Sequence, residues 1–363
     1  MTTATARLDR VRAALDAAAC DALLVTSLTN IRYLTGFTGS AGLLLVERDG
    51  AVLATDGRYK FQSAEQLAAA GLDARIEVGA IEAQRDALVR EAAGIARLGL
   101  EAGSVTWARQ RSFAEDWFVD AELLPTLGVV EALRRVKDDE ELALMARAAQ
   151  VADEALAAVK PMLLEGPTEA EFGLALDTEM RRRGATGPSF ETIVASGPNA
   201  AKPHARPSER HIERGELVVL DFGALVSGYC SDMTRTVCVG EPRSAVLTRM
   251  VEVVGEAQRR GVAVVRPGAT GIEVDRACRE FIAEAGWSDA FLHGTGHGVG
   301  LDIHEAPWVG PTSSDTLAPG HVVTVEPGVY LPEHGGVRIE DTVVVTEDGC
   351  YPLTHTPKDL ILA

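Results

Sequence analysis

Two apolar segments, 105 residues apart, share one pattern of hydrophobic and polar positions. Residues 215–223 and 320–328 each begin with a glycine, continue through five mostly apolar residues, and end with an acid, one further residue and a glycine. Apolar runs of this length predict buried strands. A second strand-like run follows each of them. The two predicted ribbons therefore carry four acids, which are Asp221 and Asp232 in the first and Glu326 and Glu340 in the second.

The repetition extends to the helices predicted upstream of each ribbon. Thr168 with Glu171, and Thr270 with Glu273, have the spacing of a capping box at the start of a helix. The capping threonine precedes the first acid of its ribbon by 53 residues in one copy and by 56 in the other. A period of this length, present only twice, does not fit a solenoid. We therefore predict a duplicated unit of helix, capped helix and ribbon, with the two copies related by a pseudo-twofold axis and the helices outside.

The four acids need an explanation, because a buried carboxylate without a partner is costly. A chance likeness between two ordinary hairpins is one reading, and a metal site between two related ribbons is the other. Carboxylate oxygens can bridge two cations and offset their repulsion. A nitrogen ligand is available at His297, in the glycine-rich segment 294–300. Four carboxylates and one histidine favour Mn²⁺, Co²⁺ or Zn²⁺ over a redox iron centre.

The first 130 residues have a different pattern, in which helical and strand-like segments alternate. The predicted helices cover residues 8–19, 61–70, 82–96 and 105–118, and the predicted strands cover residues 22–26 and 97–100. Residues 43–55 predict a hairpin with an Asp-Gly turn. A charged connector, residues 134–141, leads into a long amphipathic helix. We place the domain boundary near residue 130.

Composition narrows the class of protein. The chain of 363 residues is long enough for two domains with their own cores. Its net charge of −18 argues against sequence-independent binding to nucleic acid or to an anionic membrane. There is no apolar run of membrane-spanning length, and the N-terminus lacks the apolar core of a signal peptide. Five scattered cysteines, without a CxxC pair, predict reduced thiols in a cytoplasmic protein.

Taken together, these residues resemble a known family. Asp221, Asp232, His297, Glu326 and Glu340 match the metal-ligand set of the pita-bread dinuclear metallopeptidases. Residues 195–204, 296–307 and 337–342 resemble segments of its Xaa-Pro peptidase branch, and residues 33–42 and 55–59 resemble the N-terminal domain of aminopeptidases P. The resemblance covers the whole chain.

The resemblance implies an α+β protein with two domains. Residues 1–130 would form an α/β creatinase-like N-terminal domain, and residues 131–363 would form a catalytic domain with the pita-bread fold. Members of the family are commonly homodimers, so a homodimer that acts on proline-containing peptides is expected.

The resemblance also implies roles for individual residues. Asp232 and Glu340 would bridge two metal ions, Asp221 would chelate one, and His297 with Glu326 would complete the other. Glu326 would accept the proton of the attacking water and deliver it to the proline nitrogen. His204 and His304 would stabilise the tetrahedral intermediate, and Arg338 would support the metal ligands and the proline site. His293 and Tyr330 would line the proline slot, with Trp308 as a neighbour or as an ordinary packing residue.

Several functions fit these residues. We favour an aminopeptidase P, which removes the first residue from peptides with proline second, over an Xaa-Pro dipeptidase (prolidase), which accepts only the dipeptide. Arg58 could clamp the carboxylate of a dipeptide. A methionine aminopeptidase usually lacks the first domain, and a creatinase-like hydrolase lacks the metal ligands. A non-catalytic peptide-binding protein would have lost ligands or the paired histidines, and both His204 and His304 are present here.

Overall fold

The computed structural model describes residues 3–362, and the chain divides into two compact units, residues 1–134 and 135–363. The N-terminal unit is built on a six-stranded mixed sheet with the order β4-β3-β2-β1-β5-β6. Its strands are β1 (Ala22–Val25), β2 (Leu43–Val46), β3 (Ala51–Thr55), β4 (Arg75–Val78), β5 (Arg97–Glu101) and β6 (Glu122–Thr126). The connections β1-β2-β3 are antiparallel, and β4, β5 and β6 each join the sheet in parallel.

Helices of this unit alternate with the strands, which confirms the predicted α/β class. They are α1 (Thr3–Ala14), α2 (Leu28–Thr35), α3 (Lys60–Ala69), α4 (Ile81–Glu91), α5 (Trp107–Ser112) and α6 (Val129–Arg134). The hairpin predicted for residues 43–55 is present as β2 and β3. The helix predicted for residues 105–118 is shorter, because the chain leaves the α-helical path at Phe113 and continues as one π-helical turn to Trp117.

The C-terminal unit is a duplicated structure, as the repeated capping boxes predict. The first half contains α7 (Asp139–Val159), α8 (Glu169–Arg182), β8 (Ile193–Ser196), β9 (Leu217–Phe222) and β12 (Met233–Val239). The second half repeats this order with α9 (Ala245–Val264), α10 (Gly271–Glu284), β13 (Gly296–Gly298), β15 (Val322–Val325) and β18 (Asp341–Val345). Both capping boxes are formed, with Thr168 and Glu171 before α8 and with Thr270 and Glu273 before α10.

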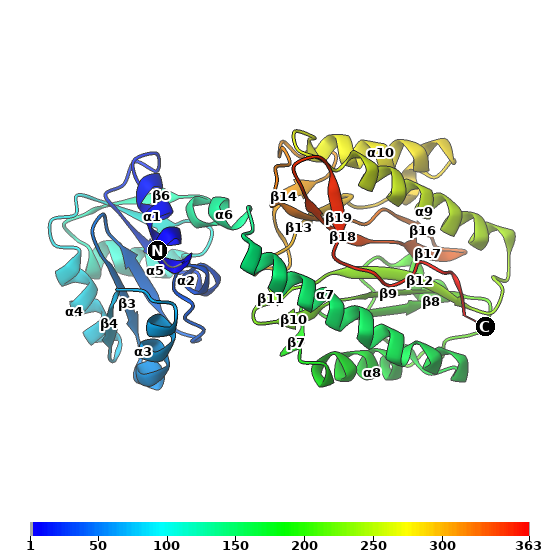
Figure 1. Ribbon diagram of the computed structural model, residues 1–363, viewed down its shortest axis with the longest axis horizontal. Helices are drawn as coiled ribbons and strands as arrows, with labels where there is room; N and C mark the ends of the chain where they lie inside the picture. Colours follow the sequence, from blue (N-terminus) through cyan, green and yellow to red (C-terminus); the bar gives the residue numbers. More distant parts are fainter. Residues whose placement is uncertain (1–2, 363) are drawn as a thin grey trace. The chain divides into compact units, whose positions relative to one another are not determined.

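Each half contributes one sheet, whose strands pair antiparallel except for β20, which joins β12 in parallel. The first has the order β20-β12-β9-β8 and the second has the order β14-β13-β15-β18-β19. The remaining strands are β7 (Gly187–Pro188), β10 (Ala224–Val226), β11 (Tyr229–Cys230), β14 (Glu305–Val309), β16 (Gly328–Leu331), β17 (Gly335–Arg338), β19 (Cys350–Pro352) and β20 (Ile361–Leu362). Within this unit, α7 and α8 lie on one side of the strands, and α9 and α10 lie on the other (Figure 1).

Two hydrophobic clusters attach the helices to the sheets. The first joins α7 and α8 to β9 and β12 through buried side chains that include Leu156, Phe172, Leu220 and Val237. The second joins α9 and α10 to β15 and β18 through side chains that include Met250, Val274, Val325 and Val343. The helices therefore cover one face of each sheet. The candidate site described below lies at the ends of β9, β12, β15 and β18, where the four acids are found. No helix among residues 3–362 combines the length and the apolar character that crossing a bilayer requires.

One histidine of the second half makes stability depend on pH. His321, which precedes β15, is 5% exposed, and its Nδ1 accepts a hydrogen bond from the backbone N–H of Ala318. Burial and the charges of Arg135 and Lys137 lower its pKa from 6.5 to about 4. Between pH 6.5 and about pH 4, His321 is protonated in the unfolded chain and neutral in the folded chain. The free energy of unfolding therefore falls as the pH drops through this range. We expect a loss of up to about 3 kcal/mol over this window and none above it.

The matched variant is His321→Asn, whose side-chain oxygen can still accept the hydrogen bond but does not titrate. Urea unfolding of both proteins at pH 7.0, 5.5 and 4.5 measures the two pH slopes. The slope of the wild-type protein should be the steeper one, and parallel curves would contradict the assignment.

Candidate metal centre

The duplicated ribbons place their acids at equivalent positions. Asp221 is the next-to-last residue of β9, and Asp232 immediately precedes β12, to which β9 is paired. Glu326 immediately follows β15 and Glu340 immediately precedes β18, to which β15 is paired. Gly223 allows the first pair of acids to approach, because a side chain at this position would collide with the carbonyl oxygen of Ser231. Each ribbon thus presents two carboxylates at the same end.

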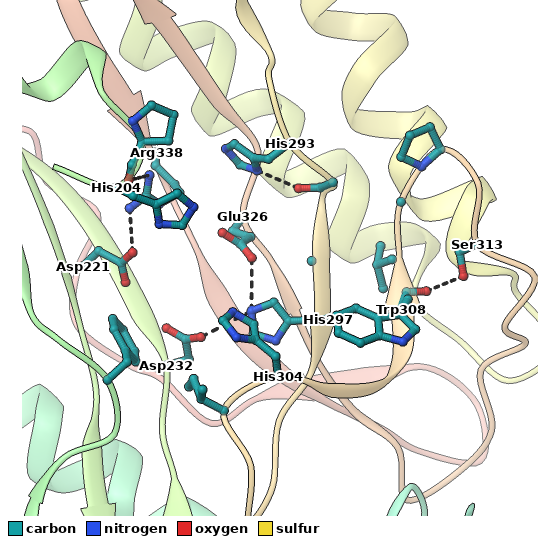
Figure 2. A pocket seen from close by; sticks show the side chains of 18 of the residues that line it. His204, Asp221, Asp232, His293, His297, His304, Trp308, Ser313, Glu326 and Arg338 are labelled. Atoms are coloured by element: carbon teal, nitrogen blue, oxygen red, sulfur yellow. Dashed lines mark hydrogen bonds and ion pairs between the residues drawn. The ribbon is translucent and has the colours of Figure 1, made fainter. Parts of the chain in front are cut away.

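His297, the candidate nitrogen ligand, lies in β13, which pairs with β15. Gly296 packs directly against the carbonyl oxygen of Thr324, where a Cβ atom has no room. This close approach seats His297, whose backbone N–H donates to Thr324 Oγ1 at 3.0 Å. The ring Nε2 then lies 3.4 Å from Glu326 Oε1 and 3.6 Å from Asp232 Oδ2 (Figure 2). The predicted histidine therefore lies between acids of both halves.

Three of the acids form a tight cluster. Asp221, Asp232 and Glu340 each present one oxygen, and these three oxygens all lie within 4.8 Å of one another. Asp232 and Glu340 are buried, and Asp221 is partly buried. Within residues 3–362, the buried atoms Asp221 Oδ1 and Glu340 Oε1 have no hydrogen-bond partner. Three carboxylates this close together, two of which carry an unpartnered oxygen, fit divalent cations, which would supply the missing positive charge.

The electrostatics of the cluster agree with a cation site. Burial and the neighbouring carboxylates raise the pKa of Asp232 and of Glu340 well above the usual range, and burial also raises the pKa of Asp221. Burial opposes the ionisation of Glu326 as well. However, its hydrogen bond with His297 and the charge of that ring outweigh burial and lower the Glu326 pKa to about 2. Glu326 is thus a carboxylate, while the other three acids repel one another.

Arg338 connects the cluster to its surroundings. Its side chain is 3% exposed and donates to Asp221 Oδ2 at 2.6 Å and to the Tyr330 hydroxyl at 2.7 Å. It also donates to the carbonyl oxygen of Pro203, the residue before His204, at 3.2 Å. The guanidinium therefore fixes one carboxylate of the cluster and the start of the loop that carries His204.

A pocket of about 860 Å³ opens over the cluster. It is lined by Asp221, Asp232, Glu326 and Arg338 and by the four histidines His204, His293, His297 and His304. The rings of His297 and His304 meet edge to face with their centroids 4.2 Å apart. Trp308, which is 49% exposed, lies on the side of Glu326 opposite to His204 (Figure 2). The structure thus brings together nearly all of the residues that the sequence singles out.

Two predicted residues are not among those that line the pocket. Tyr330 is buried and its hydroxyl is 2.8 Å from His293 Nε2, so it positions His293 and Arg338 and is not itself among the lining residues. Glu340 is likewise absent from the lining residues, although it belongs to the acid cluster. The role of Tyr330 in a substrate slot stays a prediction, and its hydroxyl contacts two residues that do line the pocket, His293 and Arg338.

Sequence reasoning missed part of the pocket. Phe190, Glu191, Ile193 and Arg206 line it on the side of the first half, and the loop 310–315 lines it on the side of the second. Arg206 lies two residues after His204, and this short spacing is the only feature of the sequence that could have indicated it. The loop 310–315 has no such signal, because its glycine, proline and hydroxyl residues are those of any surface turn.

Glu169 is a further residue that the sequence did not single out. It is buried at the start of α8, and its two carboxylate oxygens accept six hydrogen bonds from the loop that carries His204. The donors are the backbone and side chain of Ser196, the backbone and side chain of Ser208, and the amide of Asn199. One carboxylate therefore holds both ends of the loop around His204.

We expect Glu169→Gln to lower kcat about 10-fold or more, because the amide nitrogen cannot accept the donors that the carboxylate satisfies, and His204 is displaced. Bound metal should be retained, since Glu169 touches none of the acids in the cluster. Glu171→Gln, which alters the capping box two residues further on, is the control for a general weakening of α8. Equal losses of kcat in both variants would show that Glu169 acts only through helix stability.

Comparisons with known proteins agree with this geometry. The model of metallopeptidase family M24 matches residues 143–347, and the model of the creatinase/prolidase N-terminal domain matches residues 7–136. An uncharacterized peptidase of Bacillus subtilis (strain 168) is 45% identical over 98% of this chain and 99% of its own length.

Two solved structures are similar over nearly all of the chain. A structure described as an Xaa-Pro dipeptidase from Bacillus anthracis is 42% identical with a TM-score of 0.94, and it covers 99% of this chain and 100% of its own. A structure described as an X-Pro aminopeptidase from Thermotoga maritima is 34% identical with a TM-score of 0.87, and it covers 95% of this chain and 98% of its own. With its duplicated pita-bread unit and its creatinase-type first domain, the chain belongs to metallopeptidase family M24.

Proposed function

We propose that this metallopeptidase hydrolyses the peptide bond between a first residue and a following proline. The observation that carries the proposal is the cluster of Asp221, Asp232 and Glu340, with two unpartnered oxygens, beside His297 and Glu326. Proline specificity is supported by the similar proteins, whose descriptions name Xaa-Pro dipeptidase and X-Pro aminopeptidase activities.

The five residues of the centre would hold two divalent ions. Asp221, Asp232, Glu326 and Glu340 would supply carboxylate ligands, and His297 would supply the imidazole. We propose Mn²⁺ as the native metal, with Co²⁺ and Zn²⁺ as alternatives, because oxygen ligands predominate. When bound, the ions would polarise the carbonyl of the scissile bond and lower the pKa of the attacking water.

Glu326 is proposed as the proton carrier of the reaction. Its carboxylate lines the pocket beside His297, and an ionised carboxylate in this place can accept the proton of the attacking water. The same proton is then delivered to the proline nitrogen, which is a secondary amine and departs poorly as an anion. The position of Glu326 on the pocket surface, between His293 and His297 in Figure 2, allows this transfer.

The remaining pocket residues are proposed to bind and orient the substrate. His204 and His304 are exposed ring systems on the pocket surface, able to donate hydrogen bonds to the oxygen of the tetrahedral intermediate. His293, held by Tyr330, would form one wall of the proline slot, and Trp308 would form another. The nitrogen of an Xaa-Pro bond carries no hydrogen and cannot donate a hydrogen bond. The enzyme therefore has to recognise the proline by contacts with its apolar ring.

The comparisons change which substrate we favour, from longer peptides with proline second to the Xaa-Pro dipeptide. The sequence alone favoured an aminopeptidase P, whereas the dipeptidase structure is more similar to this chain than the aminopeptidase structure. We therefore propose the Xaa-Pro dipeptidase as the first candidate. An aminopeptidase P is the second candidate, favoured by the size of the pocket, since about 860 Å³ is near the upper end of the range for small-molecule sites.

A paired assay tests the function. The protein, loaded with Mn²⁺, is offered Leu-Pro and Leu-Pro-Ala at equal concentration, and free leucine is measured. Release from Leu-Pro alone establishes the dipeptidase, and release from Leu-Pro-Ala alone establishes the aminopeptidase. Ala-Leu, which lacks proline, is the control substrate. If neither proline peptide is cut, proline specificity is refuted.

The homodimer and the cytoplasmic location stay predictions, which sedimentation and cell fractionation can address.

A further inference from the structure

The active-site pocket has two walls, one from each half of the duplicated unit. His293 and Trp308, with the loop 310–315, form the wall of the second half. Phe190, Ile193 and Pro203 contribute to the wall of the first half. The acids lie between the walls, and Figure 2 shows His204 and Trp308 on opposite sides of Glu326. A peptide bound across Glu326 can place one side chain on each wall.

The proposed function, on which this inference rests, decides which side chain goes where. The proline is placed on the wall of the second half, against His293 and Trp308. The residue before it then lies on the wall of the first half. That wall is apolar at its base, where Phe190 and Pro203 are partly buried and Ile193 is 6% exposed.

The rim of this wall is charged. Glu191 and Arg206 both line the pocket, and they form an ion pair with each other. The side chain of each is 64% exposed. An ion pair at this exposure contributes little to stability, because water screens it and two long side chains must be ordered to form it. A charge on a bound peptide can therefore replace either partner without a large cost.

We propose that Glu191 and Arg206 select the charge of the residue before the proline. An acidic first residue pairs with Arg206, and a basic first residue pairs with Glu191, in each case by displacing the partner. A neutral apolar first residue packs on Phe190, Ile193 and Pro203 and leaves the ion pair closed. The pair is thus a specificity determinant for the first residue and has no part in the chemical step.

Two single substitutions test this proposal, because their effects have opposite signs. The enzyme loaded with Mn²⁺ is assayed with Glu-Pro, Lys-Pro and Leu-Pro, or with the same peptides extended by alanine if only longer peptides are cut. The value of kcat/KM for each charged substrate is divided by that for Leu-Pro in the same variant. Glu191→Gln should raise the ratio of Glu-Pro to Lys-Pro about 5-fold, and Arg206→Gln should lower it about 5-fold.

Arg259→Gln is the matched control for net charge. Arg259 pairs with Glu256 on α9 and is 70% exposed, so the substitution removes the same charge as Arg206→Gln. If Arg259→Gln shifts the ratio as much as Arg206→Gln does, the effect is one of net charge and the proposal is overturned. Ratios that stay constant in both Glu191→Gln and Arg206→Gln also overturn it.

A further arm separates the two ends of the substrate. Leu-Pro and Leu-Pro-amide differ only in the carboxylate after the proline. If Arg206→Gln changes the discrimination between these two and leaves the ratio of Glu-Pro to Lys-Pro unchanged, Arg206 binds the carboxyl end and the proposal is wrong. Failure of the proposed function is recognised separately, because the wild-type protein then cuts none of these peptides.

Discussion

Glu326→Gln is expected to lower kcat for an Xaa-Pro peptide by about three orders of magnitude, while the fold is retained. Glutamine preserves the size of the side chain and the oxygen that faces His297 and Thr324. It cannot accept the proton of the attacking water or return one to the proline nitrogen. The measurement is kcat at saturating Leu-Pro, together with the metal content of the purified variant.

Glu333→Gln is the control, because Glu333 is an exposed acid outside the active-site pocket and its loss changes the net charge equally. Activity of the Glu326→Gln variant close to that of the wild type would refute the role of Glu326 as proton carrier. A variant that lost its metal in proportion to its activity would instead make Glu326 a ligand alone.

The second large effect is expected from the two histidines, whose variants should fail for different reasons. His297 is buried between Asp232 and Glu326, so His297→Ala should weaken metal binding about 100-fold or more, and activity should disappear with the metal. His204 is exposed on the pocket surface, and His204→Ala should lower kcat about 100-fold with most of the metal retained.

Excess Mn²⁺ distinguishes these two outcomes. Added metal should restore a large part of the activity of His297→Ala and none of that of His204→Ala. If both variants lose metal to the same extent, or if both are rescued, the division between a ligand and a substrate-binding histidine is wrong.

The sequence could predict the candidate metal centre because acids stand where buried apolar strands normally carry none. Asp221 and Glu326 end apolar strands that should carry no acid, and the same violation occurs twice at one spacing. Repetition also predicted the capped helices α8 and α10, since a capping box is encoded within four residues. Features that are local and repeated can thus be read from a single sequence.

Other features depend on contacts that a sequence does not display. β4 alternates polar and apolar residues over only four positions, Arg75 to Val78, and this run is too short to distinguish a strand from a loop. The six hydrogen bonds to Glu169 arise only when the loop around His204 folds back over α8. The hydrogen bonds of the Tyr330 hydroxyl with His293 and Arg338 cannot be read from the sequence either, because their partners lie 37 and 8 positions away along the chain.

A titration of metal against activity tests the central claim most directly. The purified protein is stripped with a chelator and dialysed, Mn²⁺ is added back stepwise, and bound metal per chain is measured beside the rate of Leu-Pro or Leu-Pro-Ala hydrolysis. The account predicts that binding saturates at about two ions per chain and that activity rises with the occupancy of this pair. Full activity in the stripped protein, or a folded protein that binds no metal and cuts neither peptide, would contradict it.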